Sequence, residues 1–443
     1  MLIDSILKNL EVYGYESIEK PLLACLLTRE PILLIGSHGT GKTLLSYTLA
    51  KALGYKVEGE EREFHAYDAS KSLFEDIIGF PDPEKMKEGR VDYLNSAITI
   101  WNKKFILIDE ISRANSSMQN KWLEIIRSRS VMGKDISGLE YIFAAMNPVE
   151  YPGANPLDPA LADRFSLIVK IPDIFSHESI SGIINSLHRD DSPGLRKEKT
   201  CPEKSDQRKL KKLLSKIKEI YENLPEELVD TADKFSKMYY QNAFALSPVL
   251  YLTVSPRRAS MIFRNLKIFL SIDLYHRGSL SREDILVNLN EIAGYSWIYS
   301  AGEEEYSDYR EEVLYKTLYD IGMIRVNEFE KRRTENFIQN YKNSISPKKK
   351  LVTFLKMLFE IYRLQQNPSQ ALEQDVSVFK IIDELTVDGE DMEGFPLAVK
   401  NADINWCRLF HNFRYLQEIK PEKLKRLVKQ IKKEEDNYDI KTA

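Results

Sequence analysis

The 443-residue chain has few cysteines, and the three that it has, Cys25, Cys201 and Cys407, lie far apart. An odd number at such spacings predicts neither a disulfide framework nor a CxxC metal site. The six histidines form no HExxH or paired-ligand pattern either. These absences argue against a disulfide-rich secreted protein and favour a reducing, cytoplasmic compartment.

Long apolar runs and a basic excess are also missing. No apolar stretch approaches the roughly 18 residues that a membrane-spanning helix needs, and residues 1–10 lack the basic and then apolar pattern of a signal peptide. The net charge of −4 and the pI near 6.0 do not indicate the basic surface typical of nucleic-acid binding. With 43% hydrophobic and 29% charged residues, the composition is that of an ordinary globular protein.

Short apolar runs alternate with helical patterns in the first 171 residues. The runs predict strands at residues 32–35, 62–68, 105–108, 141–146 and 166–171. Helical stretches are predicted between them, notably at 42–53 and 116–129. Strands that alternate with helices predict a parallel α/β sheet of five strands.

A glycine-rich loop follows the first predicted strand. The sequence GSHGTGKT at 36–43 fits the GxxxxGK(S/T) pattern between a strand and a helix. Such a loop wraps backbone N–H groups around phosphates, and the following helix adds its partial positive charge. We expect Lys42 to reach the β- and γ-phosphates of a nucleotide and the Thr43 hydroxyl to bind Mg²⁺. A glycine-rich turn without a ligand is the alternative.

Two acids end the third predicted strand. Asp109 and Glu110 follow an apolar run, so they are expected at the sheet edge where the phosphate loop lies. Asp109 would hold Mg²⁺, and Glu110 would orient and polarise the attacking water. The alternative is that both acids cap the next helix.

Two further residues have two interpretations each, and a pair of arginines lies at a predicted helix start. Asn147 follows a strand and is placed to bind the γ-phosphate or the lytic water, or it forms an Asn-Pro turn. Arg164 is a candidate for stabilising transition-state charge on a phosphoryl group, and such an arginine can come from a neighbouring subunit; the alternative is a surface pair with Asp163. The pair Arg257 and Arg258 follows Pro256. Proline is ordinary at a first helical position, so the local sequence indicates a helix start there.

Taken together, five segments resemble the MoxR-type AAA+ ATPases in order and spacing. They are GSHGTGKT (36–43), LIDEISRAN (107–115), AAMNPVEYPG (144–153), LDPALADRF (157–165) and VSPRRA (254–259). The resemblance extends from about residue 20 to residue 297. It implies a P-loop AAA+ core with a parallel five-stranded sheet, followed by an α-helical lid. We expect the core at 1–178, a linker and lid at 179–297, and a C-terminal helical extension of unknown role at 298–443.

The resemblance also implies a role for each matching residue. Lys42 and Thr43 match the Walker A pair, and Asp109 and Glu110 match Walker B. Asn147 matches sensor 1, Arg164 the arginine finger, and Arg257 sensor 2, with Arg258 as the second choice. The expected ATP-binding residues are Gly36, Ser37, His38, Gly39, Thr40, Gly41, Lys42, Thr43, Leu44 and Asp109, and the expected Mg²⁺ ligands are Thr43 and Asp109.

The chain departs from the family in its phosphate loop, where Ser37 and His38 stand in place of two prolines. The phosphate ligands in such a loop are backbone amides, so binding should survive, and His38 is placed to tune it. Residues 73–95 fall where the family carries its helix 2 insert, and 130–140 where it carries the pre-sensor 1 hairpin. In the family these segments face the ring pore or the client.

The predicted function is that of an ATP-hydrolysing ring, usually of six subunits, that remodels a protein partner. In the family that partner often carries a von Willebrand factor A domain. The alternative is a nucleic-acid motor, supported by basic segments at 208–218, 348–350 and 420–433. Their charges are interleaved with Glu or Leu in a helical pattern, which favours a solvated helix face. Glu110 argues against a scaffold that binds ATP without hydrolysing it.

Overall fold

The computed structural model describes residues 6–10, 12–89, 91–136, 138–149, 151, 157–172, 180–181, 204–245, 255–298 and 307–325. By its contacts the chain divides into two units, Met1–Met323 and Ile324–Ala443. Nearly all of the second unit, including the basic segments at 348–350 and 420–433, lies outside the described residues. The first unit contains the α/β core and the helices that follow it.

A parallel five-stranded sheet forms the centre of the core, in the strand order β2-β3-β6-β1-β7. The strands are β1 (Ile32–Ile35), β2 (Phe64–Asp68), β3 (Phe105–Asp109), β6 (Tyr141–Met146) and β7 (Leu167–Lys170). This confirms the predicted sheet, and the predicted strand bounds differ from the observed ones by at most two residues. Parallel strands covered on both faces are continuously apolar, and β1 and β6 are indeed buried throughout.

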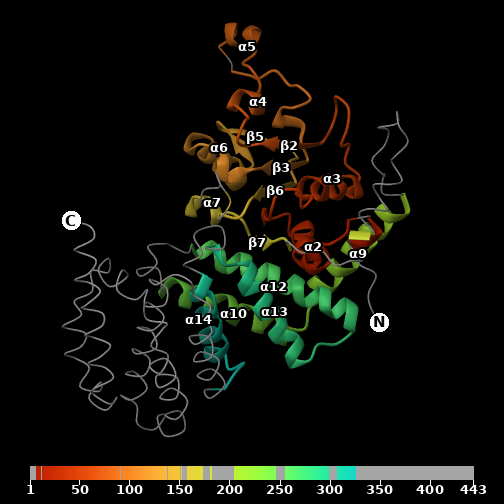
Figure 1. The fold of residues 1–443 in the computed structure, drawn as a ribbon, viewed down its shortest axis with the longest axis vertical. Coiled ribbons are helices and arrows are strands. Elements are labelled where there is room, and N and C mark those ends of the chain that lie inside the picture. The colour runs from red at the N-terminus through yellow and green to blue at the C-terminus, as the bar shows by residue number, and fades with distance from the viewer. Residues whose placement is uncertain are drawn as a thin grey trace, which may run out of the picture. The chain divides into compact units, whose positions relative to one another are not determined.

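Helices α3 (Lys42–Leu53) and α6 (Ser116–Ser128) lie on either side of the strands as drawn in Figure 1. Gly54 ends α3 in the left-handed conformation, with φ of 96°, and donates to the carbonyl oxygens of Ala50 and Lys51. Asn115 caps α6 because its side chain accepts a hydrogen bond from the Met118 amide. These local signals explain why both helices were predictable from the sequence.

The segment 73–95 leaves the core between β2 and β3 and carries two short helices, α4 (Phe74–Ile78) and α5 (Pro83–Lys87). A two-stranded antiparallel hairpin, β4 (Ser130–Val131) and β5 (Lys134–Asp135), lies where the pre-sensor 1 hairpin was expected. The two segments are joined by an ion pair between Lys134 and Asp92. The Tyr93 hydroxyl also lies 3.2 Å from the Met132 sulfur. The insert and the hairpin are therefore in contact, and α4 and α5 of the insert project at the top of Figure 1.

Helices make up most of the described residues that follow β7 in the first unit. They are α9 (Lys204–Glu222), α10 (Glu226–Ala245), α12 (Pro256–Arg277), α13 (Arg282–Tyr295) and α14 (Ser307–Asp320). Helix α12 lies at their centre and packs on α2 (Glu19–Thr28) of the core, as Figure 1 shows. Lys20 of α2 lies 2.9 Å from carboxylate oxygens of both Asp273 and Glu291. These buried faces and ion pairs hold the helical region against the core.

The remaining short elements are α1 (Ile6–Asn9), α7 (Pro159–Ala162) and the 3₁₀ turns at Glu16–Ile18, Ile100–Asn102 and Ile111–Arg113. Within the part of the chain that the structure describes, no helix has the length and apolarity to cross a bilayer.

Candidate functional site

The phosphate loop connects β1 directly to α3. Gly39 and Gly41 adopt the left-handed conformation, with φ of 77° and 85°, which disfavours residues with a side chain. A Cβ at Gly36 would come within 3.0 Å of the Ile171 Cβ, so this glycine permits close packing against the residue after β7. Backbone conformation thus favours glycine at two positions of the motif and close packing favours it at the third, as in phosphate-binding loops.

Lys42 begins α3 and points back into this loop. Its Nζ donates to the carbonyl oxygens of Gly36, at 2.6 Å, and Ser37, at 2.9 Å. The loop is fixed further by the Thr40 hydroxyl, which donates to the Ser37 carbonyl at 2.8 Å, and by the Tyr15 hydroxyl, which donates to the Thr40 carbonyl. The ammonium group is thus held at the centre of the loop that would surround the phosphates.

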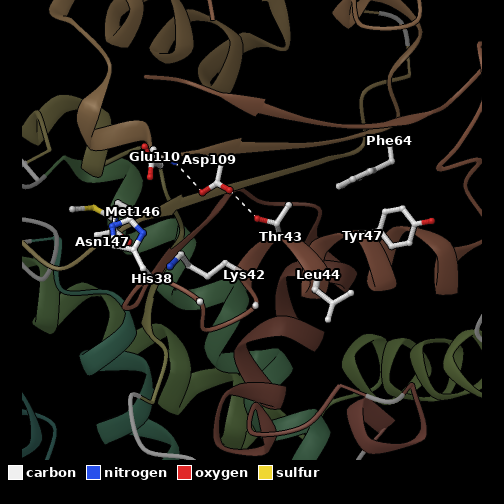
Figure 2. Close-up of a pocket in the computed structure, with 12 residues that line it drawn as sticks. His38, Lys42, Thr43, Leu44, Tyr47, Phe64, Asp109, Glu110, Met146 and Asn147 are labelled. Atoms are coloured by element: carbon white, nitrogen blue, oxygen red, sulfur yellow. Dashed lines mark hydrogen bonds between the residues drawn. The ribbon is translucent and has the colours of Figure 1, made fainter. Parts of the chain in front are cut away.

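The next residue of α3 meets the end of β3. The Thr43 hydroxyl donates to Asp109 Oδ2 at 2.8 Å, and the Glu110 amide donates to Asp109 Oδ1 at 3.0 Å (Figure 2). Hard divalent cations prefer oxygen ligands, and a hydroxyl beside a carboxylate at the edge of a phosphate loop fits Mg²⁺. When bound to a nucleotide there, Mg²⁺ would neutralise charge on the phosphate oxygens. Thr43 and Asp109 are the residues that would hold it.

Glu110 has an unusual backbone for a residue with a side chain. Its φ of 53° and ψ of 38° place it in the left-handed region, which costs about 1–3 kcal/mol. Its side chain remains 27% exposed, and Oε2 lies 3.7 Å from Nε of Arg113. Strained residues of this kind cluster at functional sites. The strain turns Glu110 out of the strand direction while its neighbour Asp109 continues β3.

Asn147 directly follows β6 and is only 3% exposed. Its Nδ2 lies 3.1 Å from Nε2 of His38 in the phosphate loop, so the two predicted site residues are in contact. His38 also lies edge-on to the ring of Tyr151, with a centroid distance of 6.1 Å. The Tyr151 hydroxyl donates to Ser37 Oγ at 2.8 Å.

Several of these residues line one pocket of about 490 Å³ at the C-terminal edge of the sheet (Figure 2). Of the predicted site residues, the lining includes His38, Gly39, Gly41, Lys42, Thr43, Leu44, Asp109, Glu110 and Asn147. The sequence analysis missed three others, Tyr47, Phe64 and Met146. Tyr47 follows Thr43 by one helical turn, and that spacing is the signal that would have found it.

The predicted arginines lie elsewhere. None of Arg164, Arg257 and Arg258 is among the described residues that line this pocket. Arg257 is exposed at the start of α12, and Arg164 is partly buried after α7. The structure therefore does not bring these arginines to the phosphate loop of their own chain.

Arg258 is only 1% exposed, unlike its neighbour. It donates to the carbonyl oxygens of Phe165 at 2.8 Å and Ser166 at 3.1 Å, and Nη2 lies 3.5 Å from the Asp163 carboxylate. Burial lowers the pKa of the Arg258 guanidinium, and the Asp163 carboxylate opposes that shift. Arg258 thus connects α12 to the segment that carries Arg164.

A parallel sheet with a phosphate loop, a Thr–Asp pair and a flanking glutamate defines a P-loop nucleotide-binding protein. Comparison with known families identifies the type of this domain more narrowly. Residues 31–165 match the family described as AAA domain (dynein-related subfamily).

Two curated proteins are similar over part of the chain. Structural protein ORF618 of Acidianus two-tailed virus is 28% identical over 240 residues, or 52% of this chain and 37% of that protein. Chaperone MoxR1 of Mycobacterium tuberculosis is 28% identical over 168 residues, or 36% of this chain and 41% of that protein. The chain thus spans less than half the length of these relatives. A crystal structure of a Cytophaga hutchinsonii protein aligns with 70% of this chain and 92% of its own, at 21% identity and a TM-score of 0.47.

The family match and the similarity to MoxR1 confirm the predicted resemblance to the MoxR-type AAA+ ATPases, and they identify residues 31–165 as an AAA domain. The match supports ATPase activity at the level of this family.

Proposed function

We propose that this protein hydrolyses ATP with Mg²⁺ in the pocket at the C-terminal edge of the sheet, and that it does so as a ring that remodels a protein partner. The observation that carries the proposal is the contact of Thr43 with Asp109, with Glu110 next to it. Phosphoryl transfer needs a charged cradle, a metal site and a group that orients water, and this edge of the sheet offers residues for all three.

Each residue has a distinct task in this proposal. Lys42 binds the β- and γ-phosphates once they replace the loop carbonyls as its partners. Glu110 accepts a hydrogen bond from the attacking water and polarises it, while Asn147 positions that water against the γ-phosphate. Thr43 and Asp109 hold the Mg²⁺ ion. The deep burial of Asn147 supports its part, because a rigid amide positions a water better than a mobile one.

A ring, usually of six subunits in this family, supplies the remaining charge. Arg164 does not line the pocket of its own chain, so any role on a phosphate requires a neighbouring subunit's pocket. In this proposal Arg164 is the finger that acts on the neighbouring ATP. Arg257, exposed at the start of the lid helix α12, is available for the sensor 2 role in the assembled ring.

The client is proposed to be a protein, for which the insert and hairpin provide a contact surface. Leu73, Phe80 and Val91 of the insert are each about two-thirds exposed, and Met132 at the hairpin tip is more than half exposed. Apolar side chains gathered on a projecting segment mark a protein-interaction site. The relative MoxR1 is described as a chaperone. A partner with a von Willebrand factor A domain is the expected adaptor.

The described basic helix gives the nucleic-acid alternative no support. In α9, Lys218 pairs with Glu222 at 3.8 Å, and Lys216 Nζ lies 5.7 Å from the ring centroid of Tyr275. Both lysines therefore interact with side chains of the same chain.

The proposal is tested by measuring phosphate release by the full chain with ATP, with and without Mg²⁺. Sedimentation with a slowly hydrolysed ATP analogue reports ring formation in the same samples. Mg²⁺-dependent release and a nucleotide-dependent increase in mass support the proposal. A monomer that binds ATP and releases no phosphate, with or without added client fractions, contradicts it.

A further inference from the structure

His38 brings together groups from three parts of the site. It belongs to the phosphate loop, yet its Nε2 lies 3.1 Å from Asn147 Nδ2, after β6. The same ring nitrogen lies 3.4 Å from Nη2 of Arg113, in the 3₁₀ turn after β3. It also lines the proposed ATP pocket, so these contacts lie next to where the phosphates would bind.

The chemistry of these partners fixes the hydrogen-bond directions. A guanidinium can only donate, so Nε2 of His38 accepts and the ring carries its hydrogen on Nδ1. The atom of Asn147 that faces the same acceptor must therefore be Nδ2. This arrangement leaves Oδ1 and the second N–H of Asn147 for other ligands.

Arg113 extends the contact to the acidic side of the site. Its Nε lies 3.7 Å from Glu110 Oε2, while Nη2 lies next to His38. Glu110, Arg113, His38 and Asn147 thus form a continuous polar chain between the proposed water-activating acid and the proposed sensor. The neighbouring charges in this pocket are Lys42 and Asp109.

The two ends of this polar chain are fixed by the fold. Asn147 is held by the buried β6, and Glu110 by its left-handed backbone after β3. Tyr151 braces the loop itself through its hydrogen bond to Ser37 and its edge contact with the His38 ring. His38 thus lies between two residues whose backbones are fixed. The length of its side chain and the position of its acceptor nitrogen determine how Asn147 and Arg113 are oriented.

We infer that His38 is a positioning residue for ATP hydrolysis, which orients the Asn147 amide and holds Arg113 beside Glu110. The inference rests on the proposed ATPase function. A positioning role of this kind affects the reaction step more than nucleotide binding, because the phosphate ligands of the loop are its backbone amides.

The test compares His38→Ala with His38→Gln in the full chain, by steady-state ATP hydrolysis and by equilibrium binding of a fluorescent ATP analogue. Alanine removes the acceptor, and we expect kcat to fall about tenfold, as loss of one positioning hydrogen bond implies, with KM and analogue affinity within about twofold. Glutamine offers an acceptor oxygen at similar reach and should recover most of the kcat. His276→Gln on α12, outside the pocket, is the matched control and should behave as wild type.

A double-mutant cycle gives a second readout. If His38 acts through Asn147, the His38→Ala and Asn147→Ala double variant should be hardly slower than Asn147→Ala alone. Should His38→Ala fail to fold by its thermal melt, His38→Leu, which keeps the volume and removes the acceptor, takes its place.

Wild-type kcat in the alanine or leucine variant, or additive losses in the cycle, overturns the role of His38 while the ATPase proposal stands. A wild-type chain that binds ATP without hydrolysing it would overturn both.

Discussion

Thr43 Oγ1 lies 2.8 Å from Asp109 Oδ2, although 66 residues separate them in the sequence. The contact joins the first turn of α3 to the end of β3, which lies two strands from β1 in the sheet. It exists because parallel strands bring their carboxyl ends to one edge, where the loop after β1 also lies. The contact places two oxygen atoms that could bind Mg²⁺ next to each other. The first prediction concerns this pair.

Thr43→Val should raise the Mg²⁺ concentration needed for half-maximal ATP hydrolysis by about tenfold or more, because valine keeps the shape and removes an oxygen ligand. Titration of Mg²⁺ at fixed ATP measures the effect. Thr48→Val, further along α3 and outside the pocket lining, is the control. An unchanged Mg²⁺ dependence in Thr43→Val argues against the proposed metal site.

Adjacent arginines should differ sharply in their contribution to stability. Arg258→Ala leaves the Asp163 carboxylate buried without its cation and removes donors from two carbonyls, so the free energy of unfolding should fall by about 3 kcal/mol. Arg257→Ala changes an exposed side chain and should stay within about 0.5 kcal/mol. Urea unfolding of both variants measures the difference. Equal losses would show that Arg258 does not hold α12 to the segment before β7.

Arg164→Ala should abolish hydrolysis in a ring made of this variant alone, with a loss of about a thousandfold or more. Mixing it with Lys42→Ala should restore some activity, because the Lys42→Ala subunit still offers Arg164 to the intact pocket of its neighbour. Phosphate release from a series of mixing ratios measures this. If no ratio restores activity, Arg164 does not act on a neighbouring subunit.

His65 should make the fold sensitive to acid. Burial lowers the pKa of its imidazole from an ordinary 6.5 to about 4, with Arg62 and Lys103 adding to the shift. Below pH 6.5 the unfolded chain therefore binds a proton that the folded chain does not, so stability falls as the pH drops toward 4. Above pH 6.5 both states are neutral and the effect is absent.

His65→Gln removes this titration, so the loss of stability between pH 6.5 and pH 4.5 should be smaller than in wild type. Urea unfolding at several pH values measures both slopes. Identical slopes in the two proteins would mean that the partial burial of His65 does not lower the pKa of its imidazole.

Much of the core was predictable because its signals are local. The strands of a parallel sheet with both faces covered are continuous apolar runs, which gave β1, β3 and β6 almost to the residue. The phosphate loop was predictable because backbone geometry demands its glycines. Asp109 and Glu110 follow from their place at a strand end.

Other features depend on contacts between distant residues. The sequence offers no signal that His38 meets Asn147, which lies 109 residues away, or that Arg113 faces the same ring nitrogen. Arg257 and Arg258 have the same chemistry and adjacent positions, and only the packing of α12 buries one and exposes the other. Tyr47 of α3 and Phe64 of β2 both line the pocket because these two elements lie next to each other in the fold.

The central claim is that Glu110 activates water in a pocket where Lys42 binds the nucleotide. The most direct test measures both ATP binding and ATP hydrolysis by the Glu110→Gln variant and by the wild-type protein. We predict wild-type affinity for ATP and a loss of hydrolysis of at least about a hundredfold, since glutamine keeps the shape and cannot accept a proton. Hydrolysis by Glu110→Gln at the wild-type rate would contradict the account.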